Sequence, residues 1–134
     1  MDYDFLVKKA IEAKEKAYAP YSGFRVGAAV QLADGRIYTG CNVENSSYGA
    51  TICAERTAIV KAISEGEAKI SAVAVASDSD RLTYPCGICR QVISEFRSGD
   101  TKIICSDKNG NYKVYDMNDI LPHAFAREDI NLSV

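Results

Sequence analysis

The chain has the size and composition of one globular domain. Its 134 residues, 47% hydrophobic and 25% charged, can bury a core without a disulfide framework. The 16 basic and 18 acidic residues are mixed along the chain and give a formal charge of −2, so the basic excess of a nucleic-acid-binding surface is missing. We therefore expect one domain over residues 1–134 and no nucleic-acid partner.

The N-terminus and the five cysteines bear on the cellular compartment. Residues 1–16 lack the basic start and apolar stretch of a signal peptide, and no segment approaches the roughly 18 apolar residues of a membrane span. These features predict a cytoplasmic protein without a membrane partner. Structural disulfides are rare in a reducing compartment, so the cysteines are expected to be metal ligands, catalytic groups or core residues.

In chain order, the first predicted elements are a helix and a hairpin. Apolar residues recur at helical spacing from residue 3 to about residue 18. Residues 25–32 and 36–43 then predict two antiparallel strands joined by a tight Asp-Gly turn. Two glycines inside these strands, Gly27 and Gly40, predict close approaches of neighbouring backbone.

Two helix–strand units follow the hairpin. The segment 53–65 predicts a helix that ends at a glycine, and the apolar run 70–77 predicts a strand covered on both faces. Residues 86–98 and 102–106 repeat that order, and an Asn-Gly turn predicts that residues 112–117 return antiparallel. This order predicts an α/β fold class, with one five-stranded mixed sheet and helices on its faces. The C-terminal tail has weaker periodicity and carries no prediction of its conformation.

Three cysteines are placed to bind one metal ion. Cys86 and Cys89 have the C-x-x-C spacing of zinc sites, and on a first helical turn their sulfurs can converge on one ion. Cys53 also lies where a connection from a strand enters a helix, at the sheet edge where the sites of open α/β folds gather. Three protein ligands leave the fourth tetrahedral position of Zn²⁺ to water, which is typical of catalytic zinc.

Two charged residues follow Cys53 closely. Glu55 is two positions after Cys53, and residues two apart lie on different sides of a helix. The side chains of Cys53 and Glu55 can therefore converge only at a helix end, where the Glu55 carboxylate can reach the metal-bound water. Glu55 is therefore a candidate general base rather than a fourth ligand. Three thiolates around Zn²⁺ leave a net charge of −1, and Arg56 together with the helix N-termini can offset it by donating hydrogen bonds to the sulfurs.

Other interpretations of these residues stay open on motif grounds. The C-G-x-C segment also occurs at the helix starts of disulfide exchangers. A structural zinc site closed by Cys41 or Cys105 would leave Glu55 a surface residue, although both cysteines lie inside predicted strands, where packing is the commoner role. His123 is a further conceivable ligand, and the polar segment 41–49 is either part of a substrate site or a solvated loop.

The combination of motifs resembles a known family. The stretches CAE and PCGICRQ are similar to the zinc-dependent deaminases of nucleosides and nucleobases. With YAPYSGFRVGAAV, G-x-NVEN-x-x-Y and CAERTAI, nearly the whole chain resembles the small homotetrameric cytidine deaminases of pyrimidine salvage. The resemblance implies a three-layer α/β/α sandwich and one Zn²⁺ per subunit. Polynucleotide editors carry histidine where this chain has Cys53, so a nucleoside substrate is expected.

The resemblance also implies a role for each matching residue. Cys53, Cys86 and Cys89 would bind zinc. Glu55 would take a proton from the metal-bound water as that water attacks C4 of cytosine, and would pass protons to ring N3 and the leaving amine. Cytidine and 2′-deoxycytidine would become uridine and 2′-deoxyuridine with release of ammonia. The implied substrate-binding residues are Asn42 and Glu44 at the ribose hydroxyls, Ala54 and Glu55 at the pyrimidine edge, Phe24 beside the sugar and base, and Tyr48 and Phe125 from neighbouring subunits, with Phe125 stacked on the base.

Two alternative functions differ from this expectation in testable ways. Deaminases of antibiotic nucleosides of the blasticidin S type share the Cys₃ ligation and a similar size, and Glu44 favours a ribose substrate over these. A structural zinc protein is the alternative outside the enzymes. It predicts that Glu55→Gln leaves the protein folded, zinc-loaded and functionally unaltered.

Overall fold

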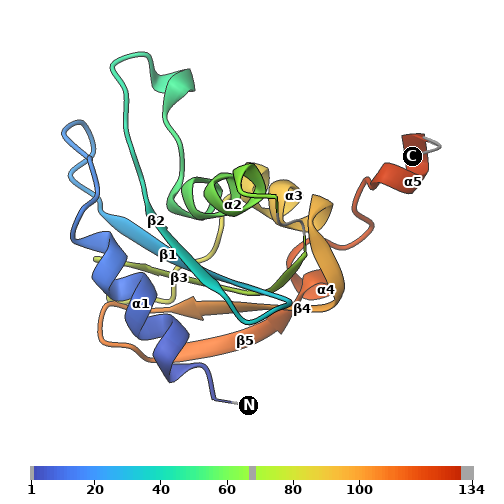
Figure 1. Ribbon diagram of the computed structural model, residues 1–134. Helices are drawn as coiled ribbons and strands as arrows, with labels where there is room; N and C mark the ends of the chain where they lie inside the picture. The colour runs from blue at the N-terminus through green and yellow to red at the C-terminus, as the bar shows by residue number, and fades with distance from the viewer. Residues whose placement is uncertain (1, 67–68, 131–134) are drawn as a thin grey trace.

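A five-stranded mixed sheet forms the centre of the protein (Figure 1). The computed structural model describes residues 2–66 and 69–130. The strands are β1 (Val26–Leu32), β2 (Ile37–Cys41), β3 (Ile70–Ser77), β4 (Arg97–Ser106) and β5 (Tyr112–Asp116). They lie in the order β2-β1-β3-β4-β5, and β3 and β4 are parallel while the other neighbouring pairs are antiparallel. The predicted mixed sheet and its two hairpins are confirmed.

Helices cover both faces of this sheet (Figure 1). The helices are α1 (Asp4–Lys14), α2 (Ala54–Ser64), α3 (Gly87–Glu95), the short α4 (Met117–Ile120) and α5 (Arg127–Ile130), with a 3₁₀ turn η1 (Tyr48–Ala50). Helix α1 packs on one face, and α2, α3 and α4 pack on the other. The three-layer α/β/α arrangement expected from the sequence is therefore present.

Strand β3 shows why the apolar runs form the middle of the sheet. Its valines, Val73 and Val75, pack into the core beneath α2 and α3. The intervening alanines, Ala72, Ala74 and Ala76, face α1 on the opposite side. Because both faces are covered, this strand is apolar at nearly every position, and the small alanines let α1 lie close to the sheet.

Two glycines allow helices to lie directly against strand backbone. A Cβ atom added to Gly27 would lie 2.0 Å from the carbonyl oxygen of Ala10 in α1. One added to Gly40 would lie 2.7 Å from the carbonyl oxygen of Ala54 in α2. Both distances are shorter than any real Cβ contact, so the close approaches predicted at these positions are confirmed.

Several predicted boundaries differ from the structure; the helix predicted over residues 86–98, for example, ends at Glu95, and the strand predicted over residues 36–43 is limited to Ile37–Cys41. Two differences have a common cause. The first helix ends at Lys14 rather than near residue 18, because Tyr18 pairs with the segment after β2. The Tyr18 N–H donates to Asn42 O at 3.0 Å, and the Tyr18 carbonyl accepts from Glu44 N at 2.8 Å. Strand β4 begins at Arg97 rather than at residue 102, because its first residue pairs with Ile70 across an irregular start of the ladder. Backbone pairing with distant segments overrides the local pattern at both places.

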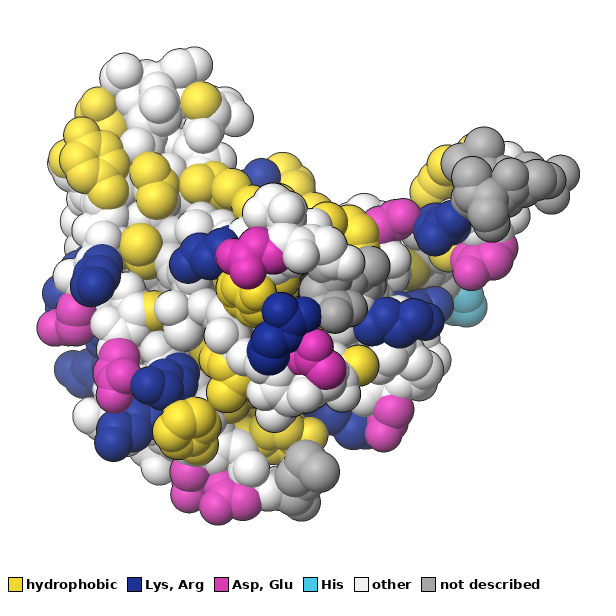
Figure 2. Space-filling view, in the orientation of Figure 1, with side chains coloured by type: hydrophobic (Ala, Val, Ile, Leu, Met, Phe, Trp, Pro, Cys, Tyr) yellow, Lys and Arg dark blue, Asp and Glu magenta, His cyan; other side chains and the backbone are white. Residues whose placement is uncertain are grey.

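Two segments extend from the body of the molecule. The connection between β2 and α2, which carries η1, and the C-terminal segment with α5 project from the side covered by α2 and α3 (Figure 1). Figure 2 shows the surface hollowed between them. Each carries an exposed aromatic residue, Tyr48 at 77% and Phe125 at 60% exposure. Within the described ranges, no helix combines the length and the apolar character needed to cross a membrane.

Candidate active site

Three cysteine sulfurs meet where α2 and α3 begin. Strands β2 and β3 are both antiparallel to β1, so the helices that follow them start at the same edge of the sheet. Cys53 and Cys86 are the N-cap residues of α2 and α3, and Cys89 is buried in the first turn of α3. The three sulfurs lie within 4.8 Å of one another, and Cys53 Sγ is 3.8 Å from Cys86 Sγ.

This donor set fits a zinc ion. Sulfurs bound tetrahedrally to Zn²⁺ at about 2.3 Å lie about 3.8 Å apart, which is the separation found between Cys53 and Cys86. In the described part of the chain, no further His, Cys, Asp or Glu belongs to the cluster. Cys41 lies in β2, and Cys105 is buried in the core of β4. The geometry therefore favours a three-cysteine site over a site closed by a fourth side chain.

The surroundings of the cluster favour thiolate. The pKa of Cys53 is lowered to about 5, mainly because the Cys89 thiol donates a hydrogen bond to its sulfur, with further hydrogen bonds from Arg56 and Cys86. The pKa of Cys89 is raised, because the same hydrogen bond holds its proton and because the thiol is buried. Arg56 Nη2 lies 3.4 Å from Cys53 Sγ, while Arg56 Nε is buried without a partner among the described residues. A cation beside the sulfurs is what an anionic metal site requires.

Glu55 is held in a largely dry environment next to the cluster. Its side chain is in the first turn of α2 and only 3% of the residue is exposed. Burial raises the pKa of Glu55 to about 7, and the negative charge of Cys53 adds to this effect. A carboxyl group with such a pKa can accept and release a proton near neutral pH, as general acid–base catalysis requires.

A cavity of about 210 Å³ opens beside Glu55 and the cysteine cluster. Six of the residues singled out in the sequence line it: Phe24, Asn42, Cys53, Ala54, Glu55 and Cys86. Thr51, Thr83 and Tyr84 line it as well, and sequence reasoning missed them because each lies in an irregular connection without a motif. The site is thus assembled from the start of β1, the end of β2 and the N-termini of two helices.

Asn42 is fixed by the backbone of the segment that leads into β1. Its Oδ1 accepts a hydrogen bond from Val26 N at 2.9 Å, and its Nδ2 donates to Phe24 O at 2.9 Å. The residue is 8% exposed. Each of the two amide atoms retains capacity for one further hydrogen bond, and Asn42 lines the cavity.

Glu44 lies in a neighbouring hollow rather than in the cavity of Glu55. This second hollow also contains Tyr48, and Thr51 lines both. The Glu44 carboxylate accepts hydrogen bonds from Tyr21 N at 3.0 Å and from Ser22 N at 3.1 Å, and a short one from Ser22 Oγ. The pKa of Glu44 is lowered, chiefly by the Ser22 hydroxyl. The sequence pattern did not indicate Tyr21 or Ser22, which lie 22 residues or more before Glu44.

The two aromatic residues expected from neighbouring subunits lie apart from the Glu55 cavity, since Tyr48 lines the second hollow and Phe125 lines neither. The ring of Tyr48 packs edge-on against Tyr21, with ring centroids 6.1 Å apart. Phe125 is on the projecting C-terminal segment, where its carbonyl accepts a hydrogen bond from Gln91 Nε2 at 2.9 Å. Within a single chain, Phe125 does not line either hollow.

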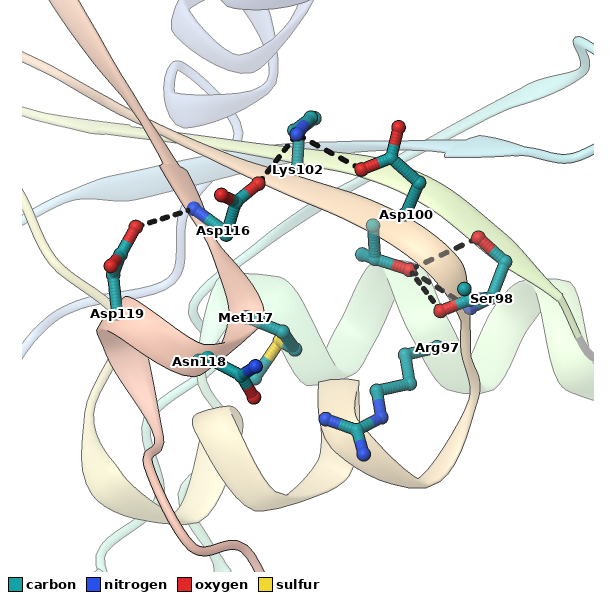
Figure 3. Close-up of a pocket in the computed structure, with 10 residues that line it drawn as sticks. Arg97, Ser98, Asp100, Lys102, Asp116, Met117, Asn118 and Asp119 are labelled. Carbon is teal, nitrogen blue, oxygen red and sulfur yellow. Dashed lines mark hydrogen bonds and ion pairs between the residues drawn. The ribbon is translucent and has the colours of Figure 1, made fainter.

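A larger hollow lies elsewhere, at the start of β4 and the end of β5 (Figure 3). Lys102 Nζ is 3.0 Å from Asp100 Oδ1 and 2.5 Å from Asp116 Oδ1, so its charge is neutralised by its neighbours. None of the residues singled out in the sequence lines this hollow. Its size alone therefore does not make it the candidate site.

Comparison with known sequences identifies related proteins. A family model described as "Cytidine and deoxycytidylate deaminase zinc-binding region" matches residues 1–106. A protein of Halalkalibacterium halodurans named cytidine deaminase is 48% identical over 131 residues, which cover 98% of this chain and 99% of the relative. A cytidine deaminase of Sporosarcina psychrophila is 45% identical, with coverage of 98% and 96%.

Solved structures show the same similarity. The crystal structure of cytidine deaminase from Burkholderia pseudomallei superposes with a TM-score of 0.88 at 42% identity, and covers 93% of this chain and 100% of its own. That of cytidine deaminase from Mycobacterium tuberculosis gives a TM-score of 0.81 at 38% identity, with coverage of 93% and 98%. The similarity therefore extends over almost all of the sheet and its helices.

Proposed function

This chain belongs to the cytidine and deoxycytidylate deaminase family, and from that premise we propose that it hydrolyses cytidine and 2′-deoxycytidine to uridine and 2′-deoxyuridine, with release of ammonia. The observation that carries the proposal is the meeting, beside one cavity, of three cysteine sulfurs that could hold a metal ion and a buried carboxyl group whose pKa is about 7. A structural zinc site has no need of such a carboxyl group. We propose that residues 1–134 act as a single catalytic domain in pyrimidine salvage in the cytoplasm.

Cys53, Cys86 and Cys89 would hold one Zn²⁺ ion per subunit. When bound, Zn²⁺ lowers the pKa of a water molecule and so supplies a nucleophile at neutral pH. Arg56 donates to the Cys53 sulfur, and the N-termini of α2 and α3 lie beside the sulfurs. These groups offset part of the negative charge of three thiolates, which would otherwise weaken the effect of the ion on water.

Glu55 would carry the protons of the reaction. Its carboxylate would accept one proton from the water that attacks C4 of cytosine and deliver it to ring N3. It would then take the second proton from the hydroxyl group formed on C4 and deliver it to the departing amine, which leaves as ammonia. Burial supports this role, because it places the pKa of Glu55 near neutral pH, where both protonation states are accessible. The Ala54 backbone and Glu55 would also contact the edge of the pyrimidine.

The sugar would be recognised by residues around the entrance of the cavity. Phe24 supplies an apolar surface for sugar and base, and Asn42, which lines the cavity, has free hydrogen-bonding capacity. Glu44 would accept a hydrogen bond from a ribose hydroxyl at the adjoining hollow. A buried or partly buried group built to bind a hydroxyl discriminates strongly against analogues that lack it.

We further propose a homotetramer in which active sites are shared between subunits. Tyr48 and Phe125 are largely exposed on the two projecting segments, and neither reaches the Glu55 cavity of its own chain. An aromatic residue so exposed has more to gain from a partner surface than from solvent. Phe125 would stack on the base bound by a neighbouring subunit, and Tyr48 would complete an adjacent site.

One assay tests the activity directly. The zinc-loaded protein is incubated with cytidine, and the spectral change to uridine is followed for the wild type and for Glu55→Gln, with zinc content and melting temperature measured for both. We expect Glu55→Gln to fold and retain zinc but to lose at least about 10²-fold in kcat. Absence of turnover of cytidine, deoxycytidine or a pyrimidine analogue by the wild type would refute the assignment. A solution mass of four times 14.6 kDa would support the tetramer, and a monomeric mass would refute it.

A further inference from the structure

We propose that Ser22 is a positioning residue, whose hydroxyl holds both the Glu44 carboxylate and the Phe24 backbone in the arrangement that binds the sugar. The inference rests on the proposed function, since Glu44 and Phe24 matter here as substrate-binding residues. Ser22 itself lines only the Glu44 hollow. It acts through its two partners.

The Ser22 hydroxyl is engaged on both sides. It donates a short hydrogen bond to Glu44 Oε2, and it accepts one from Phe24 N at 3.0 Å. Glu44 belongs to one hollow and Phe24 to the other. The Ser22 hydroxyl therefore links the proposed sugar-binding carboxylate to the wall of the cavity that contains Glu55.

The Glu44 carboxylate has little capacity left once these contacts are made. Two backbone N–H groups, of Tyr21 and Ser22, occupy Oε1, and the Ser22 hydroxyl occupies one side of Oε2. A carboxylate has about four acceptor positions, so one remains at Oε2. Without the hydroxyl, Oε2 would lose its anchor and the remaining acceptor position would have no fixed direction. A hydroxyl of a substrate would then have to order the carboxylate as it binds.

The loop has main-chain anchors that do not involve the Ser22 side chain. Tyr18 forms backbone hydrogen bonds to Asn42 and Glu44, which join the loop to the segment after β2. Within the loop, Gly23 N donates to Ala19 O at 2.9 Å. We therefore expect Ser22→Ala to remove the hydroxyl contacts while the loop keeps its course.

A simpler role for the hydroxyl is purely local. A serine hydroxyl that accepts a hydrogen bond from the N–H two residues later, as Ser22 does from Phe24, forms a common local turn. By itself such a turn only shapes the loop. Loss of a local turn would affect stability and would be independent of Glu44. Loss of the positioning contact to Glu44 would weaken substrate binding, and this part of the effect requires that Glu44 is present.

The experiment compares variants of the zinc-loaded protein with cytidine as the substrate. We expect Ser22→Ala to raise KM about tenfold, which is the low end of the effect of losing a hydrogen bond to a charged group, with kcat changed less than about threefold. Ser22→Thr keeps the hydroxyl and should stay within about threefold of the wild type. Ser46→Ala is the matched control, because Ser46 is an exposed serine in the other loop of this region.

A double-mutant cycle separates positioning from local structure. In a Glu44→Ala background, which leaves the Ser22 hydroxyl no side-chain partner at position 44, Ser22→Ala should have much less effect on KM than in the wild type, whereas a purely structural loss would be the same in both. Three outcomes would each overturn the proposal. They are equal effects of Ser22→Ala on KM in the two backgrounds, an unchanged KM in Ser22→Ala, and a Ser22→Thr variant as impaired as Ser22→Ala. A wild type inactive on cytidine would instead refute the proposed function, so the two failures are distinguishable.

Discussion

Asp78 offers a direct test of how charge holds the start of β1 in place. It follows the last residue of β3, and its carboxylate pairs with Arg25 at 3.0 Å and with Lys14 at 3.2 Å. Arg25 lies between Phe24 and Val26, the two residues whose backbone holds Asn42. We expect Asp78→Asn to loosen this segment and to lower the free energy of unfolding.

The size of the effect follows from the pKa of Asp78. The Arg25 guanidinium, and then Lys14, lower it to about 2 from an ordinary value of 3.8. A fully shielded carboxylate with this shift would contribute about 2.5 kcal/mol. The Asp78 side chain is 32% exposed, so solvent screening reduces the expected contribution to about 1 kcal/mol. The buried ammonium of Lys14 also donates to Ser77 O at 3.4 Å, and this remaining partner limits the loss in the variant.

The assay is urea denaturation of the zinc-loaded protein at fixed protein concentration, for the wild type and Asp78→Asn. Because the folded-state pKa is depressed, the stabilisation is present above the unfolded-state pKa and is lost as the pH falls toward 2. The difference between the two proteins should thus be constant from neutral pH to about pH 5 and shrink below about pH 4. Asp80→Asn is the control, since Asp80 is 80% exposed and pairs with the surface residue Lys108. An equal loss in both variants, or a difference that grows in acid, would refute this reasoning.

Three further predictions concern packing and the metal. Gly40→Ala should lower the free energy of unfolding by about 3 kcal/mol because its Cβ would overlap the backbone of α2, whereas Gly99→Ala, with open space around it, should be nearly neutral in thermal denaturation. Ile93→Ala, which empties a fully buried position, should cost about 2–5 kcal/mol in urea denaturation. Removal of zinc with a chelator should abolish cytidine turnover and lower the melting temperature, and added Zn²⁺ should restore both; an unchanged melting temperature would argue against a metal bound at the helix junction.

The elements that could be predicted from the sequence are those whose signal is local. The run 70–77 is apolar at nearly every position because both faces of β3 are covered, and its predicted bounds match the structure. The end of α1 and the start of β4 differ from the prediction because backbone pairing with distant segments decides them. Tyr18 joins residues after β2, and Arg97 pairs with Ile70. Neither pairing leaves a periodic pattern in the side chains.

The candidate site divides in the same way. The three sulfurs could be predicted to meet because each belongs to a motif at a helix start, and the α/β order brings those starts to one edge. The contact between Ser22 and Glu44 could not be predicted, because it is formed by two loops that are far apart in sequence. Loop contacts of this kind depend on the path of the backbone, which no spacing rule describes.

The junction of α2 and α3 has a consequence for assembly of the fold. Of the three cysteines proposed to bind zinc, Cys53 lies in the connection after β2, and Cys86 and Cys89 lie at the start of α3, with Cys86 33 residues further along the chain than Cys53. A peptide that contains only Cys86 and Cys89 would offer a metal ion two sulfur ligands. Tight metal binding therefore requires that the segment with Cys53 is folded against the start of α3. A change that destabilises the fold should therefore also weaken metal binding, and loss of the metal should lower the free energy of unfolding.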